Sequence, residues 1–437
     1  MESEVALEKR VIAKVARRVI PFLILLYFFA FLDRVNVGFA ALTMNKAIGL
    51  TAYTFGWGAG IFFIGYFLFE IPSNIILAKI GARVWIARIL ISWGLVSACT
   101  ALVRGPFSFM LVRFILGVAE AGFFPGVILY LTYWFPARYR AQMIGLFFAA
   151  NPISTALGSP VSALILGLDG LLGLAGWQWL FIIEGVPSVL LGFVTLGYLT
   201  DRPGQADWLS GEERDWLVNE LAKEKAEREA RYKFNLWQAL TNGYVLVLGF
   251  MYFALVTANN GLVLWQPQII KNFGLSNQQV GFVNSIPFVL GVIAMVLWGR
   301  HADRHREYRF HFALACGVAG VGLAVAALTG NSLWALIGLS VAAVGGYGAL
   351  PTFWPLPTAF LSGTAAAGGI ALINSIGNLG GFAGPYILGW LRETTKGFTA
   401  GLYFLAAAAI AAGVMAVLAR GPVGRNAPSA KPDTASS

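Results

Sequence analysis

Two pairs of charged residues lie inside long apolar stretches of this chain, where charge is costly. Asp33 and Arg34 fall late in the first stretch, and Arg113 and Glu120 fall in the fourth. A charge at the centre of a membrane helix costs roughly 2.5–3.5 kcal/mol, so it needs a partner and usually has a function. Arg113 and Glu120 are seven residues apart and share one helix face. Two cations and two carboxylates on helices that can share one cavity favour an anion-binding site.

This arrangement indicates a specific chemistry for a carboxylate substrate. A carboxylate would accept two parallel hydrogen bonds from the guanidinium fork of an arginine. It would thereby take the arginine from its acidic partner, whose affinity for a proton would rise in poorly solvated surroundings. Binding of the anion and of the proton would then favour each other, which is the basis of symport. The alternative, a set of neutralised structural ion pairs, stays open.

The other polar residues of the apolar stretches are less informative. Glu70 and Glu184 lie toward the ends of their stretches, and we interpret both as structural. At an offset of about 225 residues, Arg113 and Glu120 correspond to Gly338 and Gly345, so coupling chemistry is expected in the N-terminal half. The C-terminal half offers neutral groups that could bind substrate hydroxyls or pack between helices. They are Asn259, Asn260, Gln266, Asn284, Asn374, Ser375 and Asn378.

Composition places these residues in a membrane protein. Of the 437 residues, 58% are hydrophobic and 12% charged, and the mean hydropathy is +0.71. Soluble proteins carry roughly 25% charged residues. Apolar stretches near the ~20 residues that a spanning helix needs predict twelve α-helices rather than shorter barrel strands. They lie at about 19–38, 55–78, 84–103, 108–131, 140–166, 177–199, 240–265, 278–299, 310–329, 333–356, 365–390 and 398–419.

A long polar segment after the sixth stretch divides the chain. We predict an N-terminal six-helix bundle (1–200), a cytoplasmic linker (201–239), a C-terminal six-helix bundle (240–420) and a disordered cytoplasmic tail (421–437). Ser210 and Glu213 form a capping box that opens a charged helix to about Arg231. A weak repeat at about 225 residues accompanies the division and is typical of transporters built from two similar halves.

The positive charge is distributed as in a membrane protein. The net charge of +10 sits in short segments between apolar stretches, which argues against nucleic-acid binding. Most of the 31 Lys and Arg residues fall on the side of the N-terminus. Because such residues accumulate in the cytoplasm, both termini are expected there, in a cytoplasmic (inner) membrane. The other loops hold Lys46, Arg104, Lys271, Arg392 and Lys396.

The remaining reactive residue types do not indicate an enzyme. Cys99 and Cys316 lie in separate apolar stretches, where cysteine usually packs as a small hydrophobe. His301, His305 and His311 lie in one polar loop, so no histidine metal site within the membrane and no histidine-driven catalysis is expected. No Ser-His-Asp set, metal-ligand spacing or cofactor motif was identified. We therefore predict no enzyme activity, no metal and no cofactor.

Several runs together resemble the anion:cation symporter family of the major facilitator superfamily, most closely its bacterial tartrate-transporter branch. The resemblance covers essentially the whole chain. The loop from Gly299 to Arg309, with Asp303 and Arg304, resembles the superfamily's gating motif, whereas the loop from Lys79 to Arg88 lacks the acidic residue. The other matching runs are Asp33-Arg34-x-Asn36, Gly65-Tyr66 through Glu70-Ile-Pro72-Ser-Asn74, Arg113 with Gly117-x-x-Glu120, Trp134-Phe-Pro136, and Trp177 to Gly185.

The resemblance implies roles for individual residues. Arg34 and Arg113 would hold the substrate carboxylate, and Asp33 and Glu120 would carry protons. Tyr66 would hydrogen-bond the substrate, and Asn151 and Asn378 complete the expected substrate-binding set. Gly299, Asp303 and Arg304 would take part in gating.

The predicted function is proton-coupled uptake of a small organic carboxylate, tartrate or a similar hydroxy or dicarboxylic acid, by alternating access. The expected partners are this anion, protons and the lipid bilayer, and the protein is expected to act as a monomer. One alternative is an exchanger or uniporter for an aromatic acid, a sugar acid or a vitamin precursor. Another is a membrane sensor that binds a carboxylate without moving it, although no soluble signalling domain accompanies the helices.

Overall fold

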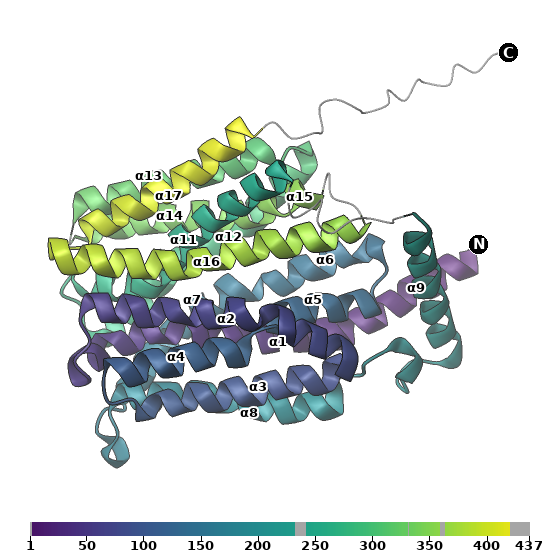
Figure 1. Cartoon of the computed structure of the whole chain (residues 1–437), viewed down its shortest axis with the longest axis horizontal. Coiled ribbons are helices and arrows are strands. Elements are labelled where there is room, and N and C mark those ends of the chain that lie inside the picture. Colours follow the sequence, from purple (N-terminus) through teal and green to yellow (C-terminus); the bar gives the residue numbers. More distant parts are fainter. Residues whose placement is uncertain (1, 232–241, 331, 359–362, 420–437) are drawn as a thin grey trace.

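The computed structural model describes residues 2–231, 242–330, 332–358 and 363–419, and these residues form helices and no strand. Most of the long helices run side by side along the longest axis of the molecule (Figure 1). In chain order they are α1 (Glu2–Ala47), α2 (Ala52–Ile80), α3 (Ala82–Cys99), α4 (Pro106–Glu120), α5 (Phe123–Trp134), α6 (Ala137–Phe148), α7 (Ala150–Leu166), α8 (Gly176–Tyr198), α9 (Gly211–Arg231), α11 (Gly243–Lys271), α12 (Asn277–His305), α13 (Arg309–Thr329), α14 (Leu333–Phe353), α15 (Pro355–Thr358), α16 (Gly363–Thr395) and α17 (Thr399–Leu418).

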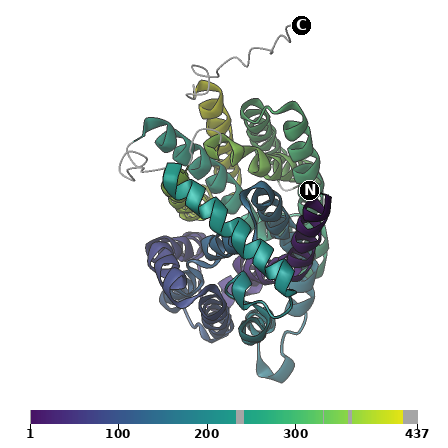
Figure 2. The same ribbon diagram turned by 90° about the vertical axis from the view of Figure 1, so that its right-hand side faces the viewer.

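The helices form two bundles, one from α1–α8 and one from α11–α17 (Figure 2). They meet along three pairs of helices: α2 packs on α16, α7 on α12, and α1 on α11. In the described residues, eleven helical segments are long and apolar enough to cross a membrane. The helix α16, with 33 residues, is not one of those eleven but lies between α2 and α11. The predicted all-α architecture of two six-helix bundles is confirmed.

The first helix is much longer than its predicted span of 19–38. It begins at Glu2 and contains 46 residues, with Pro21 inside it. Its first turns carry apolar residues that are buried, including Val11 and Val15. Because these residues pack against neighbouring segments, the helix continues beyond the stretch that hydropathy alone selects.

The charged helix α9 lies across one end of the bundles, which we call the α9 end (Figure 2). The predicted capping box is present: the backbone N–H of Glu213 donates to Ser210 Oγ at 3.3 Å, and that of Ser210 donates to Glu213 Oε2 at 3.0 Å. Lys14 Nζ donates to Glu213 Oε2 at 2.7 Å, which attaches α9 to α1. The last part of the predicted linker and the predicted tail at 421–437 lie outside the described residues.

The fourth predicted span is broken into α4 and α5 directly after Glu120. Gly122 has φ 85°, in the left-handed region that favours glycine. A Cβ atom at Gly122 would also clash with Ser73 Oγ of α2. The break places Glu120 at the last position of α4, beside irregular backbone in the interior of the bundle.

The two bundles are joined at the end opposite α9. Asn45 Nδ2 of α1 donates to Gln268 Oε1 of α11 at 3.5 Å, and Arg392 Nη1 of α16, within the C-terminal bundle, donates to the same oxygen at 2.7 Å. Asn284 Nδ2 of α12 donates to Ser159 Oγ of α7 at 2.9 Å. Helices from both bundles are therefore held together by buried and half-buried polar contacts at this end.

Candidate functional site

The centre of the site is an ion pair between the first and fourth predicted spans. Arg34 of α1 contacts Glu120 of α4 through both Nε and Nη2, each 2.6 Å from Glu120 Oε1. The side chain of Arg34 is 17% exposed, whereas that of Glu120 is 1% exposed. The second carboxylate oxygen, Glu120 Oε2, is buried without a hydrogen-bond partner within the described part of the chain. The pair is thus accessible from the arginine side.

Arg113 lies close to this pair and forms no salt bridge with an acidic residue in the described part of the chain. It is 1% exposed, and its Nε and Nη1 make no hydrogen bond to any described residue. Its guanidinium carbon lies 5.1 Å from the centre of the Phe62 ring, and that of Arg34 lies 5.4 Å from the same centre. Both cations therefore lie near one aromatic ring, which attracts positive charge through its quadrupole. Unpartnered N–H groups beside an ion pair suit an incoming anion.

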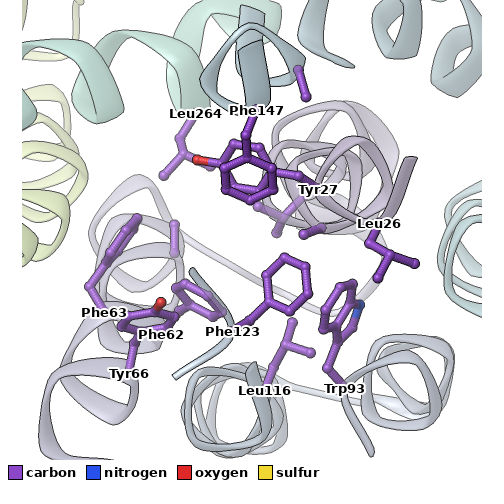
Figure 3. Packing of buried hydrophobic residues seen from close by; sticks show 14 of the residues in the cluster. Leu26, Tyr27, Phe62, Phe63, Tyr66, Trp93, Leu116, Phe123, Phe147 and Leu264 are labelled. Atoms are coloured by element: carbon purple, nitrogen blue, oxygen red, sulfur yellow. The ribbon is translucent and has the colours of Figure 1, made fainter. Parts of the chain in front are cut away.

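Aromatic side chains surround the two arginines. Tyr66 of α2 is buried, and the guanidinium of Arg34 lies 5.1 Å from its ring centre. Phe62 and Tyr66 lie together in Figure 3, while Tyr27 and Phe147 stack on the other side of the view with ring centres 4.4 Å apart. Such walls exclude water and strengthen charge-assisted hydrogen bonds between them.

Asp33 points away from its neighbour Arg34. Its carboxylate accepts hydrogen bonds from Trp93 Nε1 at 2.7 Å, Ser97 Oγ at 2.9 Å and Ser188 Oγ at 3.1 Å, all on α3 and α8. The residue is 1% exposed. The structure therefore brings Arg34, Glu120, Arg113 and Tyr66 together and places Asp33 among neutral donors. The proton-carrying role of Asp33 stays a prediction.

The predicted neutral substrate ligands lie at two different places. Asn151, at the start of α7, is half-buried, and its Oδ1 has no hydrogen-bond partner in the described ranges. Asn378 of α16 instead donates from Nδ2 to Glu70 Oε2 at 3.3 Å. Asn374, one turn earlier, donates to Glu70 Oε1 at 2.9 Å.

Glu70 has a position that the sequence interpretation did not anticipate. It is 6% exposed on α2, and both of its carboxylate oxygens bind amides from the other bundle. Glu184, by contrast, stays within the N-terminal bundle, where it accepts a hydrogen bond from Ser162 Oγ at 2.7 Å. The spacing of Asn374 and Asn378, four residues apart on one helix face, was the available signal for a shared acidic partner.

The predicted gating residues lie at the α9 end of α12. Gly299 faces Pro351 of α14, Asp303 Oδ1 accepts a hydrogen bond from the Tyr308 hydroxyl at 3.0 Å, and Arg304 is exposed. In the equivalent loop of the N-terminal bundle, the carboxylate of Asp201 accepts from the backbone N–H of Arg83 at 2.8 Å. An acidic group from the end of α8 thus contacts the loop whose own sequence lacks one.

Two similar bundles of membrane-spanning helices with charged side chains buried in one of them are typical of secondary transporters, and comparisons with known proteins identify the family. The model of the Major Facilitator Superfamily matches residues 23–385. The chain belongs to this superfamily. Its members are transporters rather than enzymes.

The chain is similar to curated transporters over nearly its whole length. A protein of Agrobacterium vitis described as "Putative tartrate transporter" is 53% identical over 412 residues, which cover 94% of this chain and 92% of that protein. A "Quinolone resistance transporter" of Acinetobacter baumannii is 45% identical over 399 residues, covering 91% and 92%.

Solved structures show the same fold. The inward-open xylose transporter XylE of E. coli superposes with a TM-score of 0.74 at 12% identity, covering 91% of this chain and 95% of that one. A bacterial homologue of the human lysosomal transporter Spinster, inward-facing and unoccupied, gives 0.71 at 18% identity, covering 94% and 95%. At these identities the likeness concerns the fold alone.

Proposed function

We propose that this transporter takes up a small organic carboxylate, tartrate or a similar hydroxy or dicarboxylic acid, together with protons. The observation that supports it best is the pairing of Arg34 with Glu120 beside the unpartnered Arg113. The 53% identity to a protein described as a tartrate transporter supports the substrate class. Two guanidinium groups suit a substrate with two carboxylates.

The first step is binding of the anion. One carboxylate of the substrate takes the free N–H groups of Arg113, which are already oriented and desolvated. A second carboxylate or a hydroxyl group then competes with Glu120 for Arg34, whose side chain is the more exposed of the pair. Tyr66 of α2 and Asn151 of α7, two helices that both contact α1, supply polar groups for substrate hydroxyls.

The second step is proton uptake by Glu120. When the substrate draws Arg34 away, Glu120 loses its counter-charge while remaining 1% exposed. An isolated carboxylate in such surroundings is strongly destabilised, and a proton relieves the cost. Because each ligand removes an obstacle to the other, anion and proton bind cooperatively. We propose Asp33 as a second, separate proton site, since no cation contacts it among the described residues.

The third step is the change of access. The bundles are joined at the end opposite α9 by the hydrogen bond from Asn45 to Gln268, and near the site by Glu70 with Asn374 and Asn378. Opening of the end opposite α9 must break the contact between Asn45 and Gln268. We propose that Glu70 and its two amides form a pivot that holds the bundles together on both sides of the cycle, and that Gly299, Asp303 and Arg304 close the α9 end.

The orientation follows from the charge distribution. The first turns of α1, the helix α9 and the segment 300–309 together hold 14 of the 31 Lys and Arg residues and lie at the same end. We place this end in the cytoplasm and the protein in the inner membrane, with both termini inside. With this orientation, the contacts of Asn45 with Gln268 and of Ser159 with Asn284 would close the outer side of the cavity.

A second candidate function is proton-linked export of a carboxylate. The 45% identity to a quinolone resistance transporter favours it. The same ion pair serves an antiporter if proton and substrate compete for the site instead of binding together. Counterflow measured with and without a pH gradient separates the two modes.

The proposal is tested by a thermal-shift screen of the purified protein against a panel of organic acids. A ligand at one hundred times its dissociation constant stabilises the folded state by about 2.7 kcal/mol. We expect tartrate or another hydroxy or dicarboxylic acid to raise the midpoint, and its amide analogue to leave it unchanged. The same acid should give no shift with Arg113→Ala. Stabilisation by no carboxylate, or an equal shift in the variant, would contradict the proposed site.

A further inference from the structure

Three histidines that are far from the transport site come together at the α9 end of the C-terminal bundle. His301 and His305 lie one turn apart at the end of α12, and His311 lies in the first turn of α13. One ring nitrogen from each residue lies within 4.8 Å of the other two. The sequence, which places all three histidines in one polar loop, did not predict that their rings come close together. It did indicate that His301 and His305, four residues apart, share one helix face.

The turn between the helices is built so that His311 returns to α12. Arg306 adopts a left-handed conformation with φ 52°, and the backbone N–H of Glu307 donates to Ala302 O at 3.3 Å. Glu307 then accepts hydrogen bonds from the backbone N–H groups of Phe310 at 2.8 Å and His311 at 3.2 Å. These contacts fix the first turn of α13 against the last turn of α12.

Hydrogen bonds to two of the rings decide which nitrogens are free. His305 Nδ1 lies 2.9 Å from His301 O, and a carbonyl only accepts, so in the neutral ring Nδ1 carries the proton. His311 Nδ1 lies 2.8 Å from Glu307 Oε2, and the carboxylate fixes that ring in the same way. The Nε2 atoms of His305 and His311 therefore present lone pairs. A carboxylate behind a histidine is the usual support of a metal ligand.

The third ring already contacts this arrangement. His301 Nδ1 lies 2.8 Å from His311 Nε2, so a proton on His301 Nδ1 is donated to His311 Nε2 and the two nitrogens face each other. A cation that binds both nitrogens takes the place of this proton. The proton then moves from Nδ1 to Nε2 of His301, so that the ring stays neutral. Zinc binds histidine nitrogen at about 2.0–2.1 Å. The exposed rings of His301 and His305 can adjust to that distance by small rotations.

We propose that His301, His305 and His311 bind one divalent transition-metal ion, with Glu307 orienting His311 and water completing the coordination. Imidazole ligands suit zinc, nickel and copper, whereas magnesium and calcium prefer oxygen. The ion joins α12 to α13 across the turn that follows Asp303 and Arg304. Since both helices belong to one bundle, it stiffens this loop without bridging the two bundles. The proposal is independent of the transported substrate.

The test uses the full-length protein, purified through a tag without histidines and treated with a chelator. Isothermal titration with Zn²⁺ should give one equivalent of binding, and X-ray absorption of the complex should show three imidazole nitrogens at about 2.0–2.1 Å. Mg²⁺ should give no heat. Glu307→Gln should weaken Zn²⁺ binding about 10- to 100-fold, as expected for loss of a carboxylate behind a metal ligand.

The variant His305→Asn is the main test substitution. His305 is exposed, so its replacement should leave the packing intact. It should lose the Zn²⁺ equivalent while its unfolding midpoint without metal stays that of the unmodified protein. The triple variant His301→Asn, His305→Asn, His311→Asn measures binding elsewhere on the surface. Equal Zn²⁺ affinity in the single and triple variants and in the unmodified protein would overturn the proposal, as would an absorption spectrum with only oxygen ligands.

Discussion

The two bundles share one architecture but bury different chemistry. The N-terminal bundle buries five charged side chains inside its spans, namely Asp33, Glu70, Arg113, Glu120 and Glu184. Among the described residues of α11–α17, the fully buried polar side chains are all neutral, namely Thr257, Gln266, Gln268, Asn284 and Thr352. In the proposed mechanism, the N-terminal bundle supplies the groups that exchange protons and bind anions, and the C-terminal bundle supplies neutral hydrogen-bonding groups and packing.

The positions that correspond to the coupling residues make the contrast sharper. At an offset of 225 residues, Arg113 and Glu120 correspond to Gly338 and Gly345 of α14. A Cβ atom at Gly338 would lie 2.5 Å from the backbone nitrogen of Ala326, and one at Gly345 would clash with the backbone of Ala319. Both glycines permit close contact of α14 with α13. At these offset positions, the N-terminal half carries the residues to which the proposal gives a chemical role, and the C-terminal half carries glycines that serve packing.

The largest effect is expected from removing the arginines of the N-terminal bundle. Truncating a buried charged partner costs about 2–5 kcal/mol, which is roughly 30- to 3,000-fold in affinity. Arg34→Ala or Arg113→Ala should lower carboxylate uptake into proteoliposomes by such factors. Gln266→Ala, in the other bundle, should lower it only a few-fold. Arg34→Lys, which keeps the charge without the fork, controls for folding. Equal losses in both bundles would remove the asymmetry.

A smaller effect, about tenfold on transport, is expected from Glu70→Gln. The substitution leaves one oxygen to accept from Asn374 or Asn378 and puts an amide donor against the other, which weakens the contact between bundles. Hydrogen bonds to charged groups contribute about 1.5–3 kcal/mol. The rate of counterflow should fall in this variant. Glu184→Gln is the matched control, since Glu184 contacts Ser162 within one bundle and should alter the unfolding midpoint alone.

Fold and site were predictable from the sequence to different degrees. Helix number, the division into two bundles and the charged helix after Ser210 follow from hydropathy, length and capping residues, all of which are local. The partner of Glu70 was missed because it lies more than 300 residues away on another bundle. The direction of Asp33 was missed because adjacent residues of a helix point to different sides, which residue types do not reveal. The histidine cluster was not predictable because it depends on the turn at Arg306, which brings His311 back to α12.

A change in stability, without a change in coupling, is expected from adding a methyl group to the packing face of the C-terminal bundle. Gly345→Ala should destabilise the protein by about 1–3 kcal/mol, the range for overpacked cores. Gly317→Ala, in α13, is its control because a Cβ atom at Gly317 meets no neighbour within 4 Å. Thermal unfolding in detergent compares the two. An unchanged midpoint in Gly345→Ala would mean that the helices separate readily there.

The smallest effect concerns the attachment of α9 to the N-terminal bundle. Its hydrogen bond from Lys14, together with the backbone N–H of Ser210, lowers the pKa of Glu213. A lowered pKa contributes stability that is present above the unfolded value of roughly 4.3 and is lost as the pH falls through the folded value. Since Lys14 is partly exposed, Glu213→Gln should cost less than about 1 kcal/mol at pH 7. The difference in unfolding midpoint should vanish on acidification, and a constant difference would contradict the ion pair.

The central claim is that Glu120 takes up a proton when the substrate draws Arg34 away from it. The decisive measurement compares pH-gradient-driven accumulation with counterflow for Glu120→Gln in proteoliposomes. We predict that accumulation against a gradient disappears while counterflow of the carboxylate continues, and that Asp33→Asn retains a response to the pH gradient. Normal accumulation by Glu120→Gln, with an unchanged response to the pH gradient, would contradict the account.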